Sequence, residues 1–287
     1  MQRREVLQSL GALMLGGPTL LAAPTGGQRR PRILFFSRSV LFEHSVVRRE
    51  GQSLSLAEKL FSEWAGRAGL DVECTKDGTV FDGDLDQYAA VVSYACGRPA
   101  DLMKPEGKDG SPPLSERGWK KLDAAVRGGK PFVAVHPGAW LLPEAVGADC
   151  LGHGAQQVAR IQVASPRFPG LEGLGESFSL LEEWFSLVRF AKDLHVILVQ
   201  DCAGMNKDQP ADRRCYDRPP FPATWARMYD RGRVFYTSLG HREDVWTKSL
   251  FQQILLGGLS WALGRLEADI TPNLDQVAPR ANEFTKP

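Results

Sequence analysis

The segment from Gly129 to Gly138 constrains the fold of this chain more than any other stretch. A glycine turn leads into the short apolar run Phe132–Val135, which ends directly on His136 and a Pro-Gly pair. A short, valine-rich run bounded by turn residues is typical of a fully buried strand. Because ligands sit at the carboxyl ends of the strands in parallel α/β sheets, we expect His136 to lie in a functional crevice.

Strand-like and helical patterns alternate through the first half of the chain. Buried strands are expected at 32–37, 70–75, 89–94 and 132–135, with helices at 54–68 and 115–126. After about residue 154 the pattern changes to strands at 158–163, 196–199, 223–229 and 233–238, with a last helix at 248–263. The alternation predicts a parallel sheet with helices on both faces. We therefore expect an α/β three-layer sandwich whose mainly parallel central sheet has an antiparallel extension.

Length and composition favour a single folded domain. The chain has 287 residues, of which 43% are hydrophobic and 24% charged, as is usual for a globular protein. We assign the domain to residues 32–265, with the polar stretch 201–222 as a loop and 266–287 as a C-terminal tail. The net charge of +1 gives no field to attract nucleic acid or an anionic membrane. A homo-oligomer remains open.

The first 27 residues have the pattern of a twin-arginine-type export signal. Arg3 and Arg4 precede a weakly apolar segment, Leu10 to Ala23, which ends in small residues. A charged start, an apolar middle and a small-residue end are the three parts of a secretory signal. The apolar part is too short to span a bilayer comfortably. We therefore expect a periplasmic or otherwise exported protein whose mature chain does not insert into a membrane.

Three of the five histidines follow apolar strands. His44 comes shortly after the first strand, His136 ends the 132–135 strand, and His241 follows the 233–238 strand. Because neighbouring strand ends converge on one crevice, three imidazoles and a carboxylate would form a divalent metal site or an acid–base cluster. Glu183 is the candidate carboxylate, since a charge within an apolar run is costly to bury without compensation. A hydrogen-bonded structural role is the alternative for each histidine.

The remaining candidates are weaker. His153, between two glycines, is a candidate for substrate binding, with a structural role as its alternative. Trp184 is a candidate for stacking on a sugar, with a core position as its alternative. We interpret His195 as a surface-loop residue. Cys96 ends a strand, but no histidine stands beside it in the sequence, so we interpret it as a small core residue.

Cysteine spacing and missing glycine motifs argue against several chemistries. No two of the five cysteines lie at C-x-x-C spacing, so neither a zinc ribbon nor a redox pair is indicated. Cys202 and Cys215 are the nearest loop pair for a disulfide in an exported protein, and their pairing is left open. The chain has no phosphate-binding loop and no G-x-G-x-x-G fingerprint, so we expect no nucleotide cofactor. The serine elbow G-x-S-x-G is also absent.

Four stretches share motifs with one known family. They are the Gly-Gly strand that ends on histidine (128–136), the glycine-histidine turn (146–153), Glu-Glu-Trp-Phe (182–185) and, most specifically, 231–264. In these stretches the chain resembles the ThuA-like (trehalose utilisation) family. The resemblance covers residues 32–265 and implies a class I glutamine amidotransferase-like, flavodoxin-like sandwich and a link to carbohydrate metabolism. It carries over as site residues His44, His136, His153, Glu183 and His241.

Three features of the resemblance bear on the chemistry. His136 occupies the position at which glutamine amidotransferases carry a nucleophilic cysteine, so amidotransfer is not expected. Pro137–Gly138–Ala139–Trp140 replaces the family's Ser-Ala and nearby Asp. Phe185 lacks the hydroxyl that a tyrosine would offer there.

These residues lead to one functional hypothesis and one alternative. We expect a protein that processes a small carbohydrate, in which His136, His241 and Glu183, supported by His44, bind a divalent metal such as Zn²⁺ or act as acid and base. The substrate would be a disaccharide or a keto-glycoside, and on a 3-keto-glycoside such a site would polarise the carbonyl and move an adjacent proton. That chemistry would serve isomerisation, or elimination or hydrolysis of the glycosidic bond. The alternative is a non-catalytic sugar-binding module with the same fold.

Overall fold

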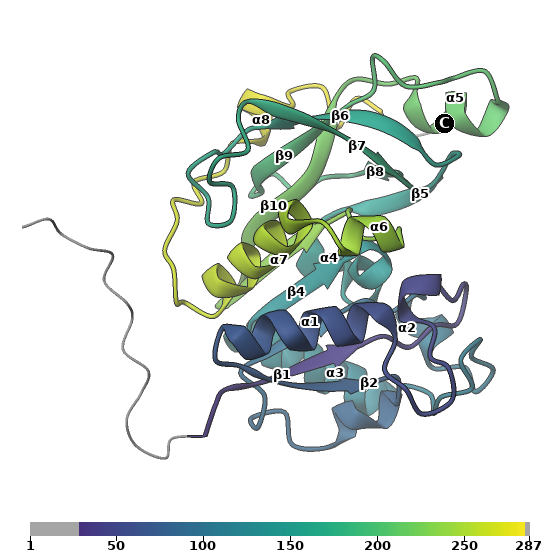
Figure 1. Cartoon of the computed structure of the whole chain (residues 1–287), viewed down its shortest axis with the longest axis vertical. Helices are drawn as coiled ribbons and strands as arrows, with labels where there is room; N and C mark the ends of the chain where they lie inside the picture. Colours follow the sequence, from purple (N-terminus) through teal and green to yellow (C-terminus); the bar gives the residue numbers. More distant parts are fainter. Residues whose placement is uncertain (1–28, 285–287) are drawn as a thin grey trace, which may run out of the picture.

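A nine-stranded sheet runs through the computed structural model, which describes residues 29–284 (Figure 1). Its strand order is β2-β1-β3-β4-β11-β10-β9-β6-β7, and β5 and β8 form a separate two-stranded sheet. The strands are β1 (Arg32–Phe36), β2 (Asp71–Thr75), β3 (Ala90–Ser93), β4 (Phe132–Val135), β5 (Asp149–His153), β6 (Gln157–Val163), β7 (Ser177–Glu182), β8 (Phe185–Val188), β9 (His195–Asp201), β10 (Phe221–Tyr229) and β11 (Gly232–Thr237). The expected export signal lies outside the described residues.

Helices and 3-10 turns connect the strands. The helices are α1 (Leu56–Arg67), α2 (Pro99–Leu102), α3 (Glu116–Arg127), α4 (Pro143–Val146), α5 (Pro210–Tyr216), α6 (Glu243–Trp246), α7 (Ser249–Ala262) and α8 (Leu274–Val277). The 3-10 turns are η1 (Ser45–Val47), η2 (Gly78–Asp82) and η3 (His136–Leu141). Among the described residues, no helix has both the length and the apolar character needed to cross a membrane.

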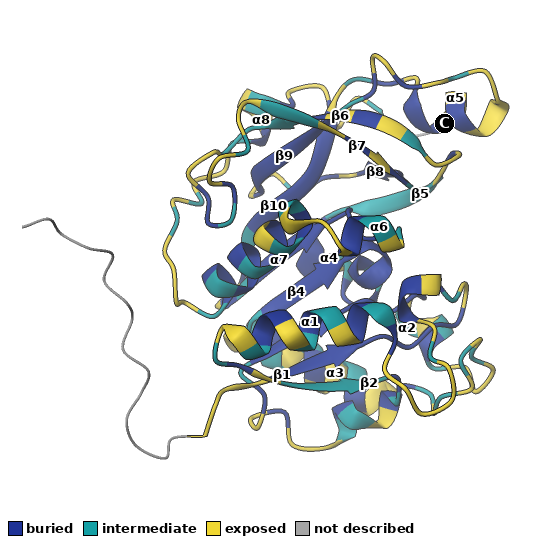
Figure 2. Ribbon diagram, viewed as in Figure 1, coloured by how far each residue is buried: buried dark blue, intermediate teal, exposed yellow. Residues whose placement is uncertain are grey.

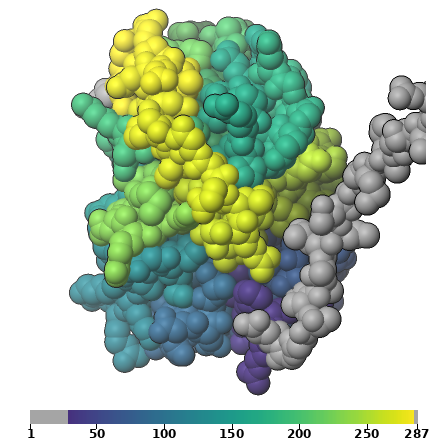
Figure 3. Space-filling model, turned by 90° about the vertical axis from the view of Figure 1, so that its left-hand side faces the viewer, coloured from purple at the N-terminus to yellow at the C-terminus, as the bar shows by residue number. Residues whose placement is uncertain are grey.

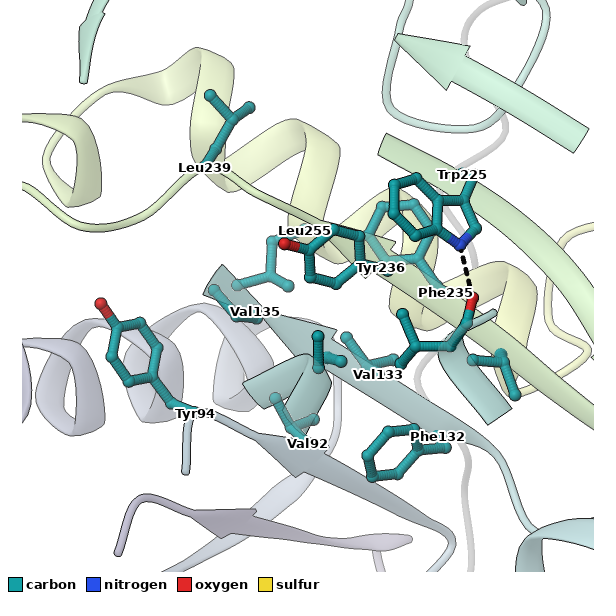
Figure 4. Packing of buried hydrophobic residues seen from close by; sticks show 14 of the residues in the cluster. Val92, Tyr94, Phe132, Val133, Val135, Trp225, Phe235, Tyr236, Leu239 and Leu255 are labelled. Atoms are coloured by element: carbon teal, nitrogen blue, oxygen red, sulfur yellow. Dashed lines mark hydrogen bonds between the residues drawn. The ribbon is translucent and has the colours of Figure 1, made fainter. Parts of the chain in front are cut away.

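One half of the large sheet is parallel, as the sequence predicts. The pairs β1–β2, β1–β3, β3–β4 and β4–β11 all run parallel. All four residues of β3 and all four of β4 are buried, because α1 and α7 cover one face of this half and α3 covers the other (Figure 1). Figure 4 shows the side chains of β4 packed between those of β3 and β11, with Val133 paired to Val92 and Phe235. The predicted three-layer sandwich is therefore confirmed.

The other half of the sheet is antiparallel. Strand β10 pairs antiparallel with β11 and with β9, and β6 pairs antiparallel with β9 and with β7. This half contains the expected antiparallel extension. Strands β5, β7 and β8 were not expected from the sequence. Polar residues or glycine interrupt β5 and β7, and β8 is only four residues long, so none of the three gives a clear alternating pattern. Figure 2 shows that exposed residues lie along β6 and β7, whereas β4, β9 and β10 are buried.

Two segments expected to be irregular carry structure. The polar stretch 201–222 contains α5, which begins at Pro210 and buries Cys215 and Tyr216. Residues 266–284 do not form a free tail: Leu274, Ala278 and Ala281 are buried. Figure 3 shows this C-terminal segment, in yellow, lying along the surface of the molecule. In both segments isolated apolar residues are scattered through polar sequence, so no helical or strand periodicity predicted their structure.

The structure corrects the expectation for His195 and answers the open question of the Cys202–Cys215 pair. His195 is not a surface-loop residue: it begins β9, is buried, and its Nδ1 lies 2.8 Å from the carbonyl oxygen of Thr271. The C-terminal segment covers it, and the sequence gave no sign that this segment packs there. Cys202 and Cys215 are both buried free thiols, so they do not form the disulfide that the sequence left open.

Candidate metal centre

Four side chains from separate parts of the chain meet at the carboxyl ends of β1, β4 and β11. His44, His136, Glu183 and His241 each supply one ligand atom, and these atoms all lie within 4.8 Å of one another. His44 precedes η1, His136 follows β4, His241 lies beyond β11, and Glu183 lies in the turn between β7 and β8. The structure thus brings together all four residues that the sequence singled out as candidate ligands.

His136 is held in an unusual backbone conformation at the end of β4. Its φ is +50°, a left-handed value that costs a non-glycine residue about 1–3 kcal/mol and persists only where the surroundings impose it. The surroundings here are a close approach to β3, because a Cβ atom on Gly138 would overlap the carbonyl oxygen of Ser93. The Pro-Gly pair in the sequence therefore marks a strained turn that points His136 into the crevice.

The tautomer of His136 follows from its hydrogen bond. Nδ1 lies 2.9 Å from the carbonyl oxygen of Ser238, and a carbonyl oxygen only accepts, so Nδ1 carries the proton. The lone pair of Nε2 then faces the cluster, 3.3 Å from Nδ1 of His241 and 3.6 Å from Oε1 of Glu183. A backbone carbonyl that fixes the second nitrogen in this way is the usual support of a metal-ligating histidine.

Glu183 stands at the centre of the cluster. Its Oε1 lies 3.2 Å from Nδ1 of His241, and its Oε2 lies 3.3 Å from Nδ1 of His153. Burial alone would raise the pKa of Glu183, but the neighbouring imidazoles of His136 and His241 hold that pKa well below its usual range. The carboxylate is therefore ionised at neutral pH. The side chains of Glu183 and His241 are 12% and 13% exposed, so the cluster reaches solvent on this side.

His44 is buried with an unpartnered nitrogen. Its ring centroid lies 5.0 Å from those of His136 and His241, edge to face in both cases. Nδ1 has no hydrogen-bond partner among residues 29–284, and leaving a buried polar atom unpaired costs about 1–3 kcal/mol. Burial, reinforced by the two neighbouring imidazoles, lowers the pKa of His44 to about 2. The ring is therefore neutral, with a lone pair available to a ligand.

Glu182 is a buried carboxylate that the sequence analysis did not single out. Its Oε2 accepts hydrogen bonds from the backbone N–H of Gly240 at 2.8 Å and of His241 at 3.2 Å, and its Oε1 accepts from the N–H of Glu183 at 3.0 Å. Burial raises the pKa of Glu182 to about 7, although these backbone N–H groups act in the opposite direction. Glu182 therefore ties the end of β7 to the turn that carries His241. The two adjacent glutamates were the only sequence signal for this role.

The two expected substrate-binding residues have different surroundings. His153 ends β5, and its side chain is 47% exposed beside Glu183. Trp184 is fully buried, and its indole N–H donates to the carbonyl oxygen of Gln157 at 2.9 Å. It has no ring face free for a sugar and takes the core position named as its alternative. Its neighbour Phe185 instead stacks on His136.

Phe185 and Trp140 form an aromatic stack beside the cluster. The ring of Phe185 stacks on His136 with a centroid distance of 4.1 Å and an interplanar angle of 10°. Trp140 stacks on Phe185 at 5.5 Å. The sequence placed both in its quoted motifs without assigning either a role. Cys96, by contrast, is buried, and burial raises its pKa to about 12, in agreement with its interpretation as a core residue.

The donor set and its spacing fit a tetrahedral metal ion. A tetrahedral Zn²⁺ with bonds of about 2.0–2.1 Å separates its ligand atoms by roughly 3.3–3.4 Å. The separations among the ligand atoms of His136, Glu183 and His241 are 3.2, 3.3 and 3.6 Å. The lowered pKa values of His44 and His136 and the ionised carboxylate of Glu183 also match the protonation states that metal binding requires. His44 completes a set of three imidazoles and one carboxylate, which suits Zn²⁺ or a similar ion.

Fold and site together define a glutamine amidotransferase-like α/β sandwich with a histidine–carboxylate cluster at its strand ends. Residues 32–262 match the ThuA family, described as trehalose utilisation, and the chain belongs to this family. The likeness to glutamine amidotransferases is therefore a likeness of fold. None of the curated proteins compared with the chain matches it.

Solved structures of related proteins have the same fold. A ThuA-like protein from Bacteroides uniformis has a TM-score of 0.63 at 15% identity, covering 86% of this chain and 95% of that one. A ThuA-like protein from Parabacteroides merdae has a TM-score of 0.60 at 16% identity, covering 90% and 96%. A cytoplasmic protein from Salmonella typhimurium has a TM-score of 0.52 at 13% identity, covering 80% and 98%. At these identities the likeness establishes the fold alone.

Proposed function

We propose that the chain is an exported carbohydrate-processing enzyme that acts on disaccharides or their keto derivatives through the histidine–carboxylate cluster. Membership of a family described as trehalose utilisation supports a carbohydrate-related role. The observation that carries the chemistry is the spacing of 3.2–3.6 Å among the ligand atoms of His136, Glu183 and His241. The twin-arginine pattern of the first residues supports export.

Each residue has a defined part in this proposal. His44, His136, Glu183 and His241 would hold the ion, which when bound would act as a Lewis acid toward a sugar carbonyl or hydroxyl oxygen. His136 presents Nε2 because Ser238 fixes its tautomer. His153 is exposed and lies next to Glu183, so it can give or take a proton at a substrate oxygen above the cluster. Glu182 fixes the backbone of His241.

The same residues support an alternative without an ion. An ionised Glu183 flanked by His241 and His153 can accept a proton from the carbon next to a keto group, as general bases do. The carbonyl oxygen would then take its proton from a histidine. This route serves isomerisation or elimination of a keto-glycoside. It differs from the first in one measurable respect, because chelators would not affect it.

Metal analysis of the purified protein separates the routes. We expect close to one Zn²⁺ or similar ion per chain, lost in Glu183→Gln and in His136→Ala. Glu63→Gln, an exposed glutamate of α1, is the matched control and should keep its metal. Turnover of trehalose and its keto derivative should fall with a chelator and return with Zn²⁺. Less than half an ion per chain, with turnover unaffected by chelator, would overturn the metal-assisted route.

The second candidate function is a non-catalytic sugar-binding module. It is favoured by the departures at residues 137–140 from the family pattern and by Phe185, which lacks the tyrosine hydroxyl. It predicts that the protein binds trehalose without turnover and that His136→Ala loses little affinity. Binding that falls more than tenfold in His136→Ala, or measurable turnover, would exclude it.

A further inference from the structure

A small pocket opens beside the candidate metal centre. Its volume is about 210 Å³, and its lining includes Leu41, Arg98, Trp140, Gly152, His153 and Phe185. Two of these residues also belong to the surroundings of the cluster. Phe185 stacks on His136 at 4.1 Å, and His153 lies 3.3 Å from the carboxylate of Glu183. A molecule in the pocket would therefore lie directly next to the ligand atoms.

The pocket has an aromatic wall. Trp140, on η3, is half-buried, and its ring stacks on Phe185 at 5.5 Å with an interplanar angle of 27°. Leu41, which is 50% exposed, adds an apolar rim. Flat, partly exposed aromatic surface attracts the polarised C–H groups of a sugar ring face, because the π face carries partial negative charge. Trp140 is thus placed to stack on a sugar ring, the role expected from the sequence for Trp184.

Charge in and around the pocket favours a neutral ligand. Arg98 lies at the rim, but its guanidinium is 3.7 Å from Asp149, which also pairs with Arg189 at 2.5 Å. The ionised Glu183 lies behind His153. An anionic sugar would gain no unpaired cation and would face this carboxylate. The ring of His153 and the backbone of Gly152 remain as partners for hydroxyl groups.

The volume limits the ligand to a single ring. Pockets for drug-sized ligands enclose about 300–1,000 Å³, and this pocket is smaller. We infer that the pocket is a subsite for one neutral pyranose ring that stacks on Trp140 and directs its linkage toward the candidate metal centre. This inference rests on the proposed carbohydrate function and names its substrate class: a neutral di- or oligosaccharide gripped by one terminal ring.

Calorimetric titration of the full chain with methyl α-D-glucoside tests the subsite. Wild type should bind it, and Trp140→Ala should bind about tenfold more weakly, a factor equivalent to ~1.4 kcal/mol. Trp140→Phe keeps a ring face and should stay within threefold of wild type. Trp119→Phe is the control, since this indole donates to the carbonyl oxygen of Leu141 and is not among the lining residues. D-glucuronate should bind no better than the neutral glycoside.

Metal content keeps this test separate from the test of the proposed function. Trp140→Ala should keep the metal content of wild type, because Trp140 is not one of the four candidate ligands. The subsite is refuted if wild type binds no neutral glycoside at about 100 mM, if Trp140→Ala binds within twofold of wild type, or if glucuronate binds tenfold more tightly. If the protein holds no metal and shows no turnover but still binds the glycoside in a Trp140-dependent way, only the enzymatic proposal is overturned.

Discussion

Replacing Glu182 with glutamine should change how the stability of the fold depends on pH. In the folded chain the carboxyl group of Glu182 holds its proton up to about pH 7, whereas its ordinary pKa is 4.5. Between these values the folded state binds more protons than the unfolded state, so the free energy of unfolding falls as pH rises. Glutamine does not titrate and lacks this dependence. The change therefore isolates one buried group.

The size of the effect follows from the two pKa values. Between pH 5 and pH 8 the titration of Glu182 removes about 2.5 kcal/mol from the free energy of unfolding of wild type. Glu182→Gln also leaves one of the three backbone N–H groups facing an amide NH₂, at a cost of about 1–3 kcal/mol that does not depend on pH. We therefore expect the variant to be less stable at pH 5 and to regain about 2.5 kcal/mol relative to wild type by pH 8.

Urea unfolding of the chelator-treated chain, followed by tryptophan fluorescence, provides the measurement. Removing any ion matters because a cation in the cluster would itself lower the pKa of Glu182. The buried histidines titrate in both chains and cancel in the difference. Glu63→Gln, exposed on α1, should keep a constant difference from wild type within about 0.5 kcal/mol. A gap between wild type and Glu182→Gln that changes by less than about 1 kcal/mol from pH 5 to pH 8 would refute the reasoning.

Three other changes test separate parts of the structure. Gly138→Ala should destabilise the fold by about 3 kcal/mol or more, because its Cβ meets the Ser93 carbonyl, and should lower metal content; an unchanged melting temperature would contradict this packing. The pKa of His44 is about 2 in the folded chain and 6.5 ordinarily, so below pH 6.5 the unfolded chain binds a proton that the folded chain does not. The free energy of unfolding therefore decreases as pH drops below 6.5, by about 2 kcal/mol at pH 5. His44→Gln should lack this decrease in the chelated protein, as urea titrations at pH 5 and 7.5 would reveal. Ending the chain at residue 262 should lower the melting temperature by several degrees, because Asn273 and Leu274 cover β9; calorimetry showing no change would make the C-terminal segment dispensable.

The large sheet could be predicted from the sequence because its strands are dense in apolar, β-branched residues. Runs such as Phe132–Val135 are typical of a strand buried on both faces. Strand-end convergence then placed His44, His136 and His241 together without knowledge of any contact. Strands β5, β7 and β8 could not be found in this way, since polar residues interrupt their alternation and pairing between distant segments supplies their stability.

The sequence could not predict the direction in which individual side chains of the site point. Glu182 and Glu183 are identical residues at adjacent positions, and only the turn after β7 decides which one faces the histidines. The same turn sends Trp184 into the core and Phe185 onto His136. Trp140 carried no signal because its position depends on the strained conformation of His136 four residues earlier. Such details arise from tertiary packing, which no local pattern records.

The four candidate ligands come from widely separated parts of the chain, at positions 44, 136, 183 and 241. Sites built on one helix, such as H-E-x-x-H, keep two ligands close even when the rest of the chain unfolds. No such local pair exists among these four. An unfolded chain would have almost no affinity for the ion, and binding energy would go entirely into stabilising the folded state. Ion binding and folding would then be coupled, so removing the ion would lower the free energy of unfolding of the whole domain.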